Sequence, residues 1–204
     1  MEGARLAVLA SGEGTNLQAL LDDEAVGPRV ELVVSDREGA RALVRARERG
    51  VPAAFLDPSD HPDRAAYDRA LLDLLREESI THVALAGFMR IVGPELVGAF
   101  EGRMLNVHPA LLPAFPGAHA IADALAWGVR VTGVTVHLVD EEVDHGPIVA
   151  QEPVRILPDD DADSLAERIH EVEHRLYPAA VGALLDGRVR VEGRVVRILE
   201  EASR

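Results

Sequence analysis

The chain has 204 residues, a formal net charge of −14 and no cysteine. Its length suffices for one domain with a substantial core, and no apolar stretch is long enough for a membrane helix. The missing cysteines exclude disulfides, thiolate metal sites and a cysteine nucleophile, and all 21 basic residues are arginine, which excludes lysine Schiff bases. The acidic surface disfavours nucleic acid and anionic membranes as partners. The N-terminus lacks a signal-peptide pattern, so we expect a cytoplasmic protein.

The first 86 residues alternate between apolar segments typical of strands and amphipathic segments typical of helices. We expect strands at residues 5–10, 30–35, 53–56 and 82–86. Helices are expected from about residue 15, at residues 41–49, and after residue 60 to about Ser79, with Arg64 in the first turn of the third. In that helix Tyr67, Leu71, Leu74 and Leu75 form the expected buried stripe. This order predicts parallel strands joined by right-handed crossovers.

A glycine-rich turn, residues 11–16, joins the first strand to the first helix, with Thr15 or Asn16 as the expected N-cap. Backbone N–H groups and the positive helix end at such a turn suit a phosphate. The dinucleotide fingerprint fails, because Leu17 stands where its third glycine should be, and the Gly-Lys-Ser/Thr phosphate loop fails too. A tight turn without a ligand therefore stays an alternative.

Residues 87–94 form an apolar segment bounded by glycine and proline, with Arg90 inside it. Two interpretations are open: a buried helix start with a snorkelling arginine, or a hydrophobic wall for a flat ligand. Arg64 by itself is typical of a solvated surface residue.

Residues 104–109 predict a short buried strand that ends at Pro109. Side chains alternate along a strand, so Asn106 and His108 should lie on the same face, near the carboxyl end where open α/β sheets bind ligands. Histidine can transfer a proton near neutral pH, and an asparagine amide can donate a hydrogen bond to a developing oxyanion. This pair is the candidate catalytic centre.

The second half mixes irregular segments with expected antiparallel strands. A proline-rich segment at residues 110–119 precedes a helix at 121–127, and strands at 131–139 and 148–156 flank an acidic turn at 140–147. Carboxylates in such a turn are most often simply solvated. The tail at residues 188–199 predicts a hairpin around Glu192 and Gly193.

The last long helix should begin with a capping box at Ser164 to Glu167. Its expected buried stripe is Leu165, Ile169, Val172 and Leu176, and Glu173 should be half-buried at the edge of that stripe. No repeat, low-complexity segment or linker interrupts the chain. We therefore expect a single α/β domain over residues 1–204, with a doubly wound open sheet. Its N-terminal half should be parallel and Rossmann-like, and its C-terminal half should carry antiparallel strands and the long helix.

These motifs together resemble the phosphoribosylglycinamide formyltransferases, the folate-dependent enzymes of purine synthesis. The resemblance covers residues 5 to about 190, and its most specific parts are Ala86-Gly87-Phe88-Met89-Arg90, Asn106-Val107-His108-Pro109, and Asp144-x-Gly146-Pro147. It implies transfer of the formyl group of 10-formyltetrahydrofolate, the co-substrate, to the amine of glycinamide ribonucleotide. The half at about residues 1–100 would bind the ribonucleotide phosphate. The half at about residues 101–204 would bind the folate and carry out catalysis.

The resemblance also implies roles for individual residues. Asn106, His108 and Asp144 would be catalytic, with Asp144 favouring the imidazolium form of His108 and fixing its orientation. The implied ribonucleotide-binding residues are Gly12, Glu13, Gly14, Thr15, Asn16 and Glu173. The implied folate-binding residues are Arg64, Met89, Arg90, Ile91, Val92, Asn106, Val139, Asp140, Val143 and Asp144.

Further expectations concern the surroundings of this site. The family has a mobile loop, here residues 110–131, in which the role of His119 stays open and no role is assigned to Ile121. The Leu112–Pro113 bond is a candidate cis peptide. His137, His145 and His170 are expected to be surface or satisfied hydrogen-bonding residues. No metal is expected, since no metal-ligand spacing such as H-E-x-x-H occurs.

Other functions stay open at this point. A methionyl-tRNA formyltransferase would need a basic tRNA-binding extension, and a formyltetrahydrofolate hydrolase usually carries an additional N-terminal domain. A non-catalytic folate- or nucleotide-binding module would leave Asn106, His108 and Asp144 without a purpose. The partners expected are the two small-molecule substrates, and the chain could be a monomer or a homodimer.

Overall fold

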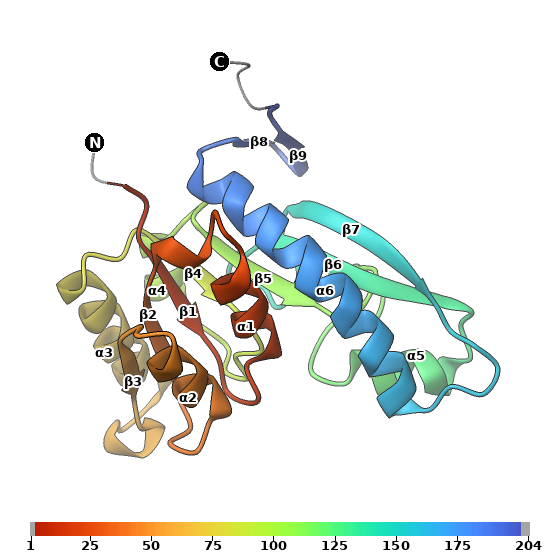
Figure 1. Cartoon of the computed structure of the whole chain (residues 1–204), viewed down its shortest axis with the longest axis horizontal. Helices are drawn as coiled ribbons and strands as arrows, with labels where there is room; N and C mark the ends of the chain where they lie inside the picture. The colour runs from red at the N-terminus through yellow and green to blue at the C-terminus, as the bar shows by residue number, and fades with distance from the viewer. Residues whose placement is uncertain (1–2, 201–204) are drawn as a thin grey trace. The chain divides into compact units, whose positions relative to one another are not determined.

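The computed structural model describes residues 3–200. It divides into two compact units, and the division falls between Leu105 and Asn106. We call these the N-terminal unit and the C-terminal unit and describe each by itself (Figure 1). That residues 1–204 form a single domain stays a prediction.

The N-terminal unit is built on four parallel strands, as predicted. These are β1 (Leu6–Leu9), β2 (Val30–Ser35), β3 (Ala53–Phe55) and β4 (His82–Leu85), in the spatial order β3-β2-β1-β4. The central strand β1 pairs with β2 on one side and β4 on the other, and all four of its side chains are buried. Burial on both faces explains why this strand is almost wholly apolar.

Three helices and two short 3₁₀ turns connect these strands, and a fourth helix follows β4. The helices are α1 (Thr15–Asp22), α2 (Arg41–Glu48), α3 (Arg64–Glu77) and α4 (Pro94–Ala99), and the turns are η1 (Gly27–Arg29) and η2 (Pro58–Asp60). Helix α1 contacts α2, and α3 contacts α4. The predicted stripe of α3 is wrong at Leu74, which is half-buried, because Leu72 and Asp68 take the buried positions instead.

The C-terminal unit contains the predicted antiparallel strands. Strand β5 (Met104–His108) spans the division, and β6 (Val131–Leu138) lies between β5 and β7 (Ile148–Arg155), with which it pairs antiparallel. Helix α5 (Ala120–Trp127) precedes β6. The predicted tail hairpin is confirmed as β8 (Val189–Glu192) and β9 (Val195–Ile198).

Helix α6 (Ala162–Leu185) lies along β6 and β7 and also contacts α5 (Figure 1). Its predicted capping box is wrong in position: the N-cap is Asp161, whose side chain accepts from the Ser164 N–H, and Ser164 is the third helical residue. The buried stripe also differs, because it follows i, i+4 spacing through Leu165, Ile169, Glu173 and Tyr177, whereas Val172 and Leu176 are half-buried. Glu173 therefore lies within the stripe, not at its edge.

Asp160 joins the turn before α6 to the helix. Its carboxylate accepts hydrogen bonds from the Leu157 N–H at 2.6 Å and the Ser164 hydroxyl at 3.0 Å, and it pairs with the Arg168 guanidinium. The Arg168 guanidinium is the main cause that lowers the pKa of Asp160 to about 2. The ionised pair therefore contributes to stability above the ordinary carboxyl pKa of about 3.9 and loses that contribution as the pH falls toward 2.

Replacing Arg168 with leucine should remove this contribution. We expect a Tm several degrees below wild type at pH 7, and a difference between the two proteins that shrinks as the pH falls from 4 to 2, where wild-type Asp160 also becomes protonated. Thermal unfolding followed by circular dichroism at a series of pH values measures both effects. A Tm difference that stays constant across this pH range would contradict the assignment of the stabilisation to the Arg168–Asp160 pair.

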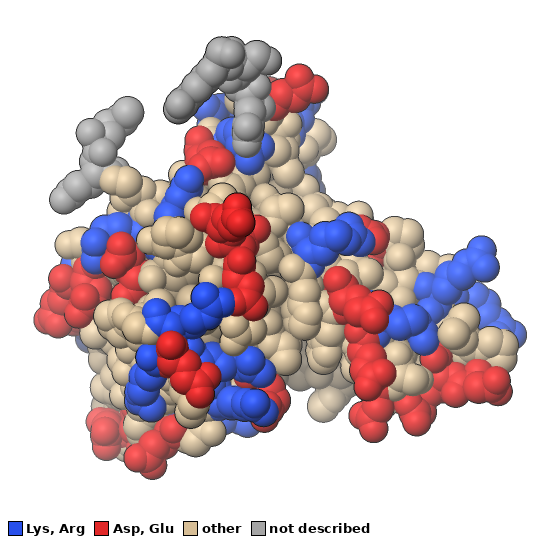
Figure 2. Space-filling view, in the orientation of Figure 1, with Lys and Arg blue, Asp and Glu red and all other residues tan. Residues whose placement is uncertain are grey.

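The net charge of −14 is not gathered into one patch on the face that Figure 2 shows, where acidic and basic side chains are interspersed. In the described part of the chain, no helix has both the length and the apolar composition needed to span a membrane.

Candidate active site

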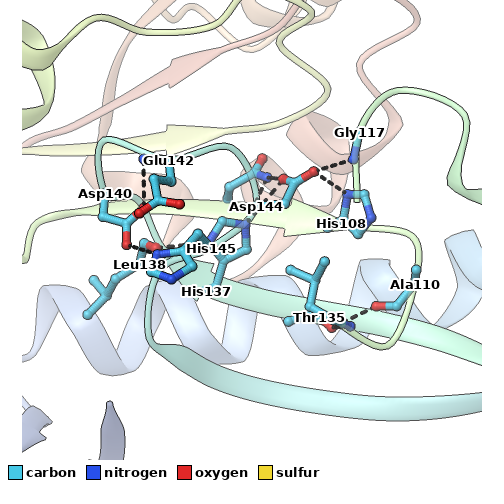
Figure 3. A network of polar contacts seen from close by, with 12 residues as sticks. His108, Ala110, Gly117, Thr135, His137, Leu138, Asp140, Glu142, Asp144 and His145 are labelled. Atoms are coloured by element: carbon cyan, nitrogen blue, oxygen red, sulfur yellow. Dashed lines mark hydrogen bonds and ion pairs between the residues drawn. The ribbon is translucent and has the colours of Figure 1, made fainter. Parts of the chain in front are cut away.

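The predicted catalytic side chains meet in the C-terminal unit, around the carboxylate of Asp144 (Figure 3). Asn106 and His108 lie on β5, and Asp144 lies on the turn between β6 and β7. Asn106 Nδ2 donates to Asp144 Oδ1 at 3.3 Å, and His108 Nδ1 lies 3.3 Å from Asp144 Oδ2. Alternation along β5 thus places the amide and the imidazole on one face, as predicted, with one carboxylate between them.

The His108 ring faces an oxygen acceptor on each side. Its Nδ1 meets Asp144, and its Nε2 lies 2.8 Å from the carbonyl oxygen of Phe115. Burial lowers the pKa of His108, because it disfavours the cation, whereas Asp144 and the Phe115 carbonyl act in the opposite direction and do not cancel it. Asp144 contacts the ring and favours the imidazolium, as expected, but burial outweighs this effect on the pKa of His108.

Asp144 is held in its ionised form by several donors. Burial acts to raise its pKa, but the contact with His137, the Gly117 N–H, which donates at 2.7 Å, and the nearby His108 together lower it. Its backbone has a positive φ of 53°, an uncommon conformation for an aspartate outside a tight turn. The carboxylate is 9% exposed, so its interactions act in a poorly solvated environment.

The turn that carries Asp144 is fixed at several points. Asp140 accepts the Glu142 N–H at 3.1 Å and lies 2.7 Å from His145 Nδ1, and Arg194, at the tip of the β8–β9 hairpin, donates to the His145 carbonyl at 2.6 Å. A Cβ at Gly146 would collide with the Leu138 carbonyl, so only glycine allows this close backbone approach. The expected folate-binding residues Val139, Asp140 and Val143 lie on this turn.

The segment after His108 is anchored to β6 by Thr135. The Thr135 hydroxyl donates to the Ala110 carbonyl at 2.6 Å and accepts the Leu112 N–H at 3.0 Å (Figure 3). The Leu112–Pro113 bond is cis, as hypothesised. His119 is the N-cap residue of α5, and the expected mobility of residues 110–131 stays a prediction.

In the N-terminal unit, the glycine-rich loop is folded against α2. The Gly12 carbonyl accepts the Ala42 N–H at 3.1 Å, and the Glu13 carbonyl accepts from Arg45 Nε at 2.8 Å. Since a trans peptide points its N–H away from its C=O, the amides of Glu13 and Gly14 face the opposite side. Gly14, with φ of 70° and no room for a Cβ against Ala42, is the N-cap of α1, so the expected cap at Thr15 or Asn16 is wrong.

The remaining expected folate-binding residues of this unit lie on two elements. Met89, Arg90, Ile91 and Val92 lie in neither helix nor strand, so the interpretation as a buried helix start is wrong and α4 begins only at Pro94. Met89 and Ile91 are 59% and 55% exposed. Arg64 is the first residue of α3 and is exposed, as predicted.

Glu173 on α6 is buried, with only 4% of its surface exposed, so the expectation of half-burial is wrong. Tyr177, one helical turn further on, is fully buried, and burial together with the nearby Glu173 charge raises the pKa of its hydroxyl well above the ordinary value. The expected role of Glu173 in binding the amine of the ribonucleotide stays a prediction.

Comparison with known proteins identifies the family of this chain. The family model described as formyl transferase matches residues 4–181. The chain belongs to the formyl transferase family. A phosphoribosylglycinamide formyltransferase of Mycobacterium tuberculosis is 53% identical over 194 residues, which cover 94% of this chain and 89% of that protein. The crystal structure of glycinamide ribonucleotide transformylase 1 from Symbiobacterium toebii superposes with a TM-score of 0.94 at 48% identity, covering 97% of this chain and 95% of that one.

Another formyl transferase relative has a different organisation. The trifunctional purine biosynthetic protein adenosine-3 of Drosophila melanogaster is 43% identical over 196 residues, which cover 94% of this chain but only 14% of that protein. The likeness therefore concerns one part of a longer protein. The predicted α/β fold, with its parallel N-terminal half, antiparallel C-terminal strands and long final helix, is confirmed by these comparisons and by the structure.

His137 belongs to the candidate site of this formyl transferase but is not among the predicted site residues. Its Nε2 lies 3.1 Å from Asn106 Nδ2 and 3.6 Å from Asp144 Oδ1, and its Nδ1 lies 2.8 Å from the Leu138 carbonyl. The expectation of a satisfied hydrogen-bonding residue holds, but the partners include two candidate catalytic groups. The signal available was its inward position on a strand next to the acidic turn.

His145 is likewise a hydrogen-bonding residue at the surface, as expected, although it contacts Asp140 of the same turn. Among residues 3–200, no group of three or more His, Cys, Asp or Glu side chains is arranged to hold a metal ion. The prediction that the enzyme needs no metal is not tested by this observation.

Proposed function

We propose that this formyl transferase moves the formyl group of 10-formyltetrahydrofolate to the amine of glycinamide ribonucleotide, a step of purine biosynthesis. The arrangement of Asn106, His108 and Asp144 is the observation that carries the proposal, because it combines a proton carrier, an amide donor and an orienting carboxylate in one buried group. The named relatives support this acceptor. No covalent intermediate with the protein is required.

The proposed chemistry begins with neutral His108, the form that its lowered pKa favours. The amine nitrogen forms a bond to the formyl carbon, the carbonyl electron pair moves to oxygen, and the amine proton passes to His108, directly or through water. The imidazolium then protonates N10 as the bond between carbon and N10 breaks. Asp144 faces Nδ1 of the ring and stabilises the positive charge while it exists.

One ring nitrogen must become available for this transfer. Nε2 faces the Phe115 carbonyl and Nδ1 faces Asp144. We infer that the substrate replaces the Phe115 carbonyl at Nε2, since Asp144 is needed on the other side to hold the ring. Phe115 has a positive φ of 53° and lies in the segment expected to be mobile, which makes it the easier partner to displace.

Asn106 is proposed to stabilise the oxyanion. Its Nδ2 carries two N–H groups, which now meet His137 at 3.1 Å and Asp144 at 3.3 Å. Exchange of the longer contact for the substrate oxygen would place a donor at the developing charge while His137 keeps the amide oriented. Removal of one such donor typically lowers the rate about 10²–10³-fold.

The substrate-binding roles follow the same proposal. The loop of Gly12, Glu13, Gly14, Thr15 and Asn16 would hold the ribonucleotide phosphate through its backbone N–H groups and the N-terminus of α1. Glu173 would bind the glycinamide amine while it is a cation. The folate would contact the segment 89–92 and the turn with Val139, Asp140, Val143 and Asp144, mainly through backbone groups, and Arg64 would meet its carboxylate end.

Absorbance of tetrahydrofolate release tests the function. Purified protein is mixed with 10-formyltetrahydrofolate, with and without glycinamide ribonucleotide, and we expect turnover only when both are present. Turnover without the ribonucleotide would replace the proposal with a hydrolase. Tight folate binding without turnover in either mixture would replace it with a binding module. A typical kcat of about 10 per second makes turnover easy to detect in this assay.

A further inference from the structure

We propose that Asp68, a buried aspartate of α3, is a positioning residue that fixes the backbone of the segment 89–92 for the folate. This inference rests on the proposed function, because folate binding is part of that function. It assigns a role to a residue outside the expected folate-binding set. It concerns the N-terminal unit alone, where Asp68 and the segment both lie.

The segment is tied at both ends by side chains from other elements. At its start, the Met89 N–H donates to the hydroxyl of Ser11, which follows β1, at 2.8 Å. Just past its end, the Gly93 N–H donates to Asp68 Oδ2 at 2.8 Å. The two anchored residues and the three between them are in neither helix nor strand.

The cost of placing Asp68 here indicates a purpose beyond helix stability. It is 5% exposed, and burial raises the pKa of its carboxyl, against the opposing effects of the Gly93 N–H and of Arg64 and Arg90. A leucine at this position would extend the apolar stripe of α3 without that desolvation cost. The aspartate instead supplies an acceptor for one backbone amide of the segment.

Gly93 is matched to this arrangement. Its φ of −87° is open to any residue, so conformational freedom does not explain a glycine here. A Cβ at Gly93 would instead collide with the Asp68 carboxylate. The absence of a side chain is therefore what lets the carboxylate reach the N–H, and the two residues act as a pair.

The middle of the segment also docks on α3. The Arg90 guanidinium lies over the ring of Tyr67, the neighbour of Asp68, 4.6 Å from the ring centroid. The Arg90 side chain is thus engaged with the protein, while Met89 and Ile91 expose their side chains. This leaves the backbone groups and two apolar side chains to meet a flat ligand, in keeping with recognition of a pteridine.

Replacing Asp68 with alanine should raise the KM for 10-formyltetrahydrofolate about 10-fold, because the buried Gly93 N–H loses its acceptor and the segment loses its fixed path. The kcat and the KM for the ribonucleotide should stay within about 2-fold of wild type, since catalysis and phosphate binding use other residues. Asp68→Asn keeps one oxygen acceptor and should recover most of the folate affinity. Asp73→Ala, an exposed aspartate of the same helix, is the matched control and should change neither KM.

A merely structural role would give a different result. In that case Asp68→Ala would lower the Tm and leave the KM for folate unchanged, or Asp68→Asn would fail to recover it, and either result overturns the proposal. If Asp68→Ala does not fold, Ser11→Ala releases the other end of the segment and should raise the same KM. An unchanged KM in that variant would equally overturn it.

This test separates its own failure from that of the proposed function. Wild-type turnover with both substrates, together with an unaffected Asp68→Ala variant, would leave the formyl transfer intact and refute the positioning role. If wild type does not turn over, calorimetric titration with tetrahydrofolate still measures the effect of Asp68→Ala on folate affinity. Equal affinities of wild type and variant would then refute the positioning role as well.

Discussion

Replacing His108 with alanine should lower kcat about 10²–10⁴-fold, with little change in either KM. The imidazole is 5% exposed and lies between Asp144 and the Phe115 carbonyl, so its removal takes away the proposed proton carrier of the site. An interaction made only in the transition state lowers kcat and kcat/KM equally. Steady-state kinetics with each substrate varied in turn measure this pattern.

His174, an exposed histidine of α6, gives the matched control, and His174→Ala should retain wild-type kcat. Thermal unfolding of both variants separates loss of chemistry from loss of fold. A His108→Ala enzyme that is stably folded and keeps more than about a tenth of wild-type kcat would exclude His108 as the proton carrier.

Replacing Asp144 with asparagine should lower kcat by a similar factor of about 10²–10⁴ and should also change its pH dependence. Burial already lowers the pKa of His108, and Asp144 opposes that shift. Without the carboxylate charge, the pKa of His108 should fall further. Since the base must be neutral, activity declines as the pH falls through this pKa, and the acidic limb of the kcat/KM profile should move to lower pH in the variant.

The kcat/KM profile of each protein between pH 4.5 and 8 measures the position of that limb, a range that brackets the ordinary histidine pKa of about 6.5. Two separate causes act on this profile. Its plateau is lower in Asp144→Asn because the imidazolium loses the stabilising carboxylate charge. Its acidic limb shifts because the imidazolium is more acidic without that charge. An acidic limb that moves to higher pH in Asp144→Asn would contradict the proposed role of the carboxylate.

Much of the fold could be predicted because hydrophobic periodicity depends on near neighbours in the sequence. Such local patterns predict the buried strand at residues 6–9 and the alternation of strands and helices up to β4, and the structure confirms both. The wrong predictions concern helix positions whose burial is decided by tertiary packing. Leu72 replaces Leu74 in the stripe of α3, and Glu173 and Tyr177 replace Val172 and Leu176 in that of α6.

The helix starts were misplaced by competition between capping residues. Asp161 and Ser164 can each cap a helix, and the aspartate three residues earlier does so, which makes Ser164 its capping-box partner. At α1 the backbone of Gly14, in a left-handed conformation against Ala42, begins the helix without a side-chain cap. Local sequence cannot rank such alternatives, because the packing of neighbouring helices selects among them.

The candidate site was predicted in part for a similar reason. Strand alternation places Asn106 and His108 together, but only the three-dimensional fold brings Asp144 between them and His137 against Asn106. The protonation preference of His108 also could not be predicted, since it depends on how deeply the ring is buried. Asp68 gave no signal at all, because a lone aspartate on a helix is usually a solvated residue.

The fate of the formyl carbon tests the central claim most directly. 10-Formyltetrahydrofolate labelled with ¹³C in the formyl group is incubated with the enzyme and glycinamide ribonucleotide, and carbon NMR identifies the product. The account predicts a formamide signal on the ribonucleotide that forms with wild type and is nearly absent with His108→Ala. Label that appears instead as free formate, or a formamide that forms equally fast without His108, would contradict it.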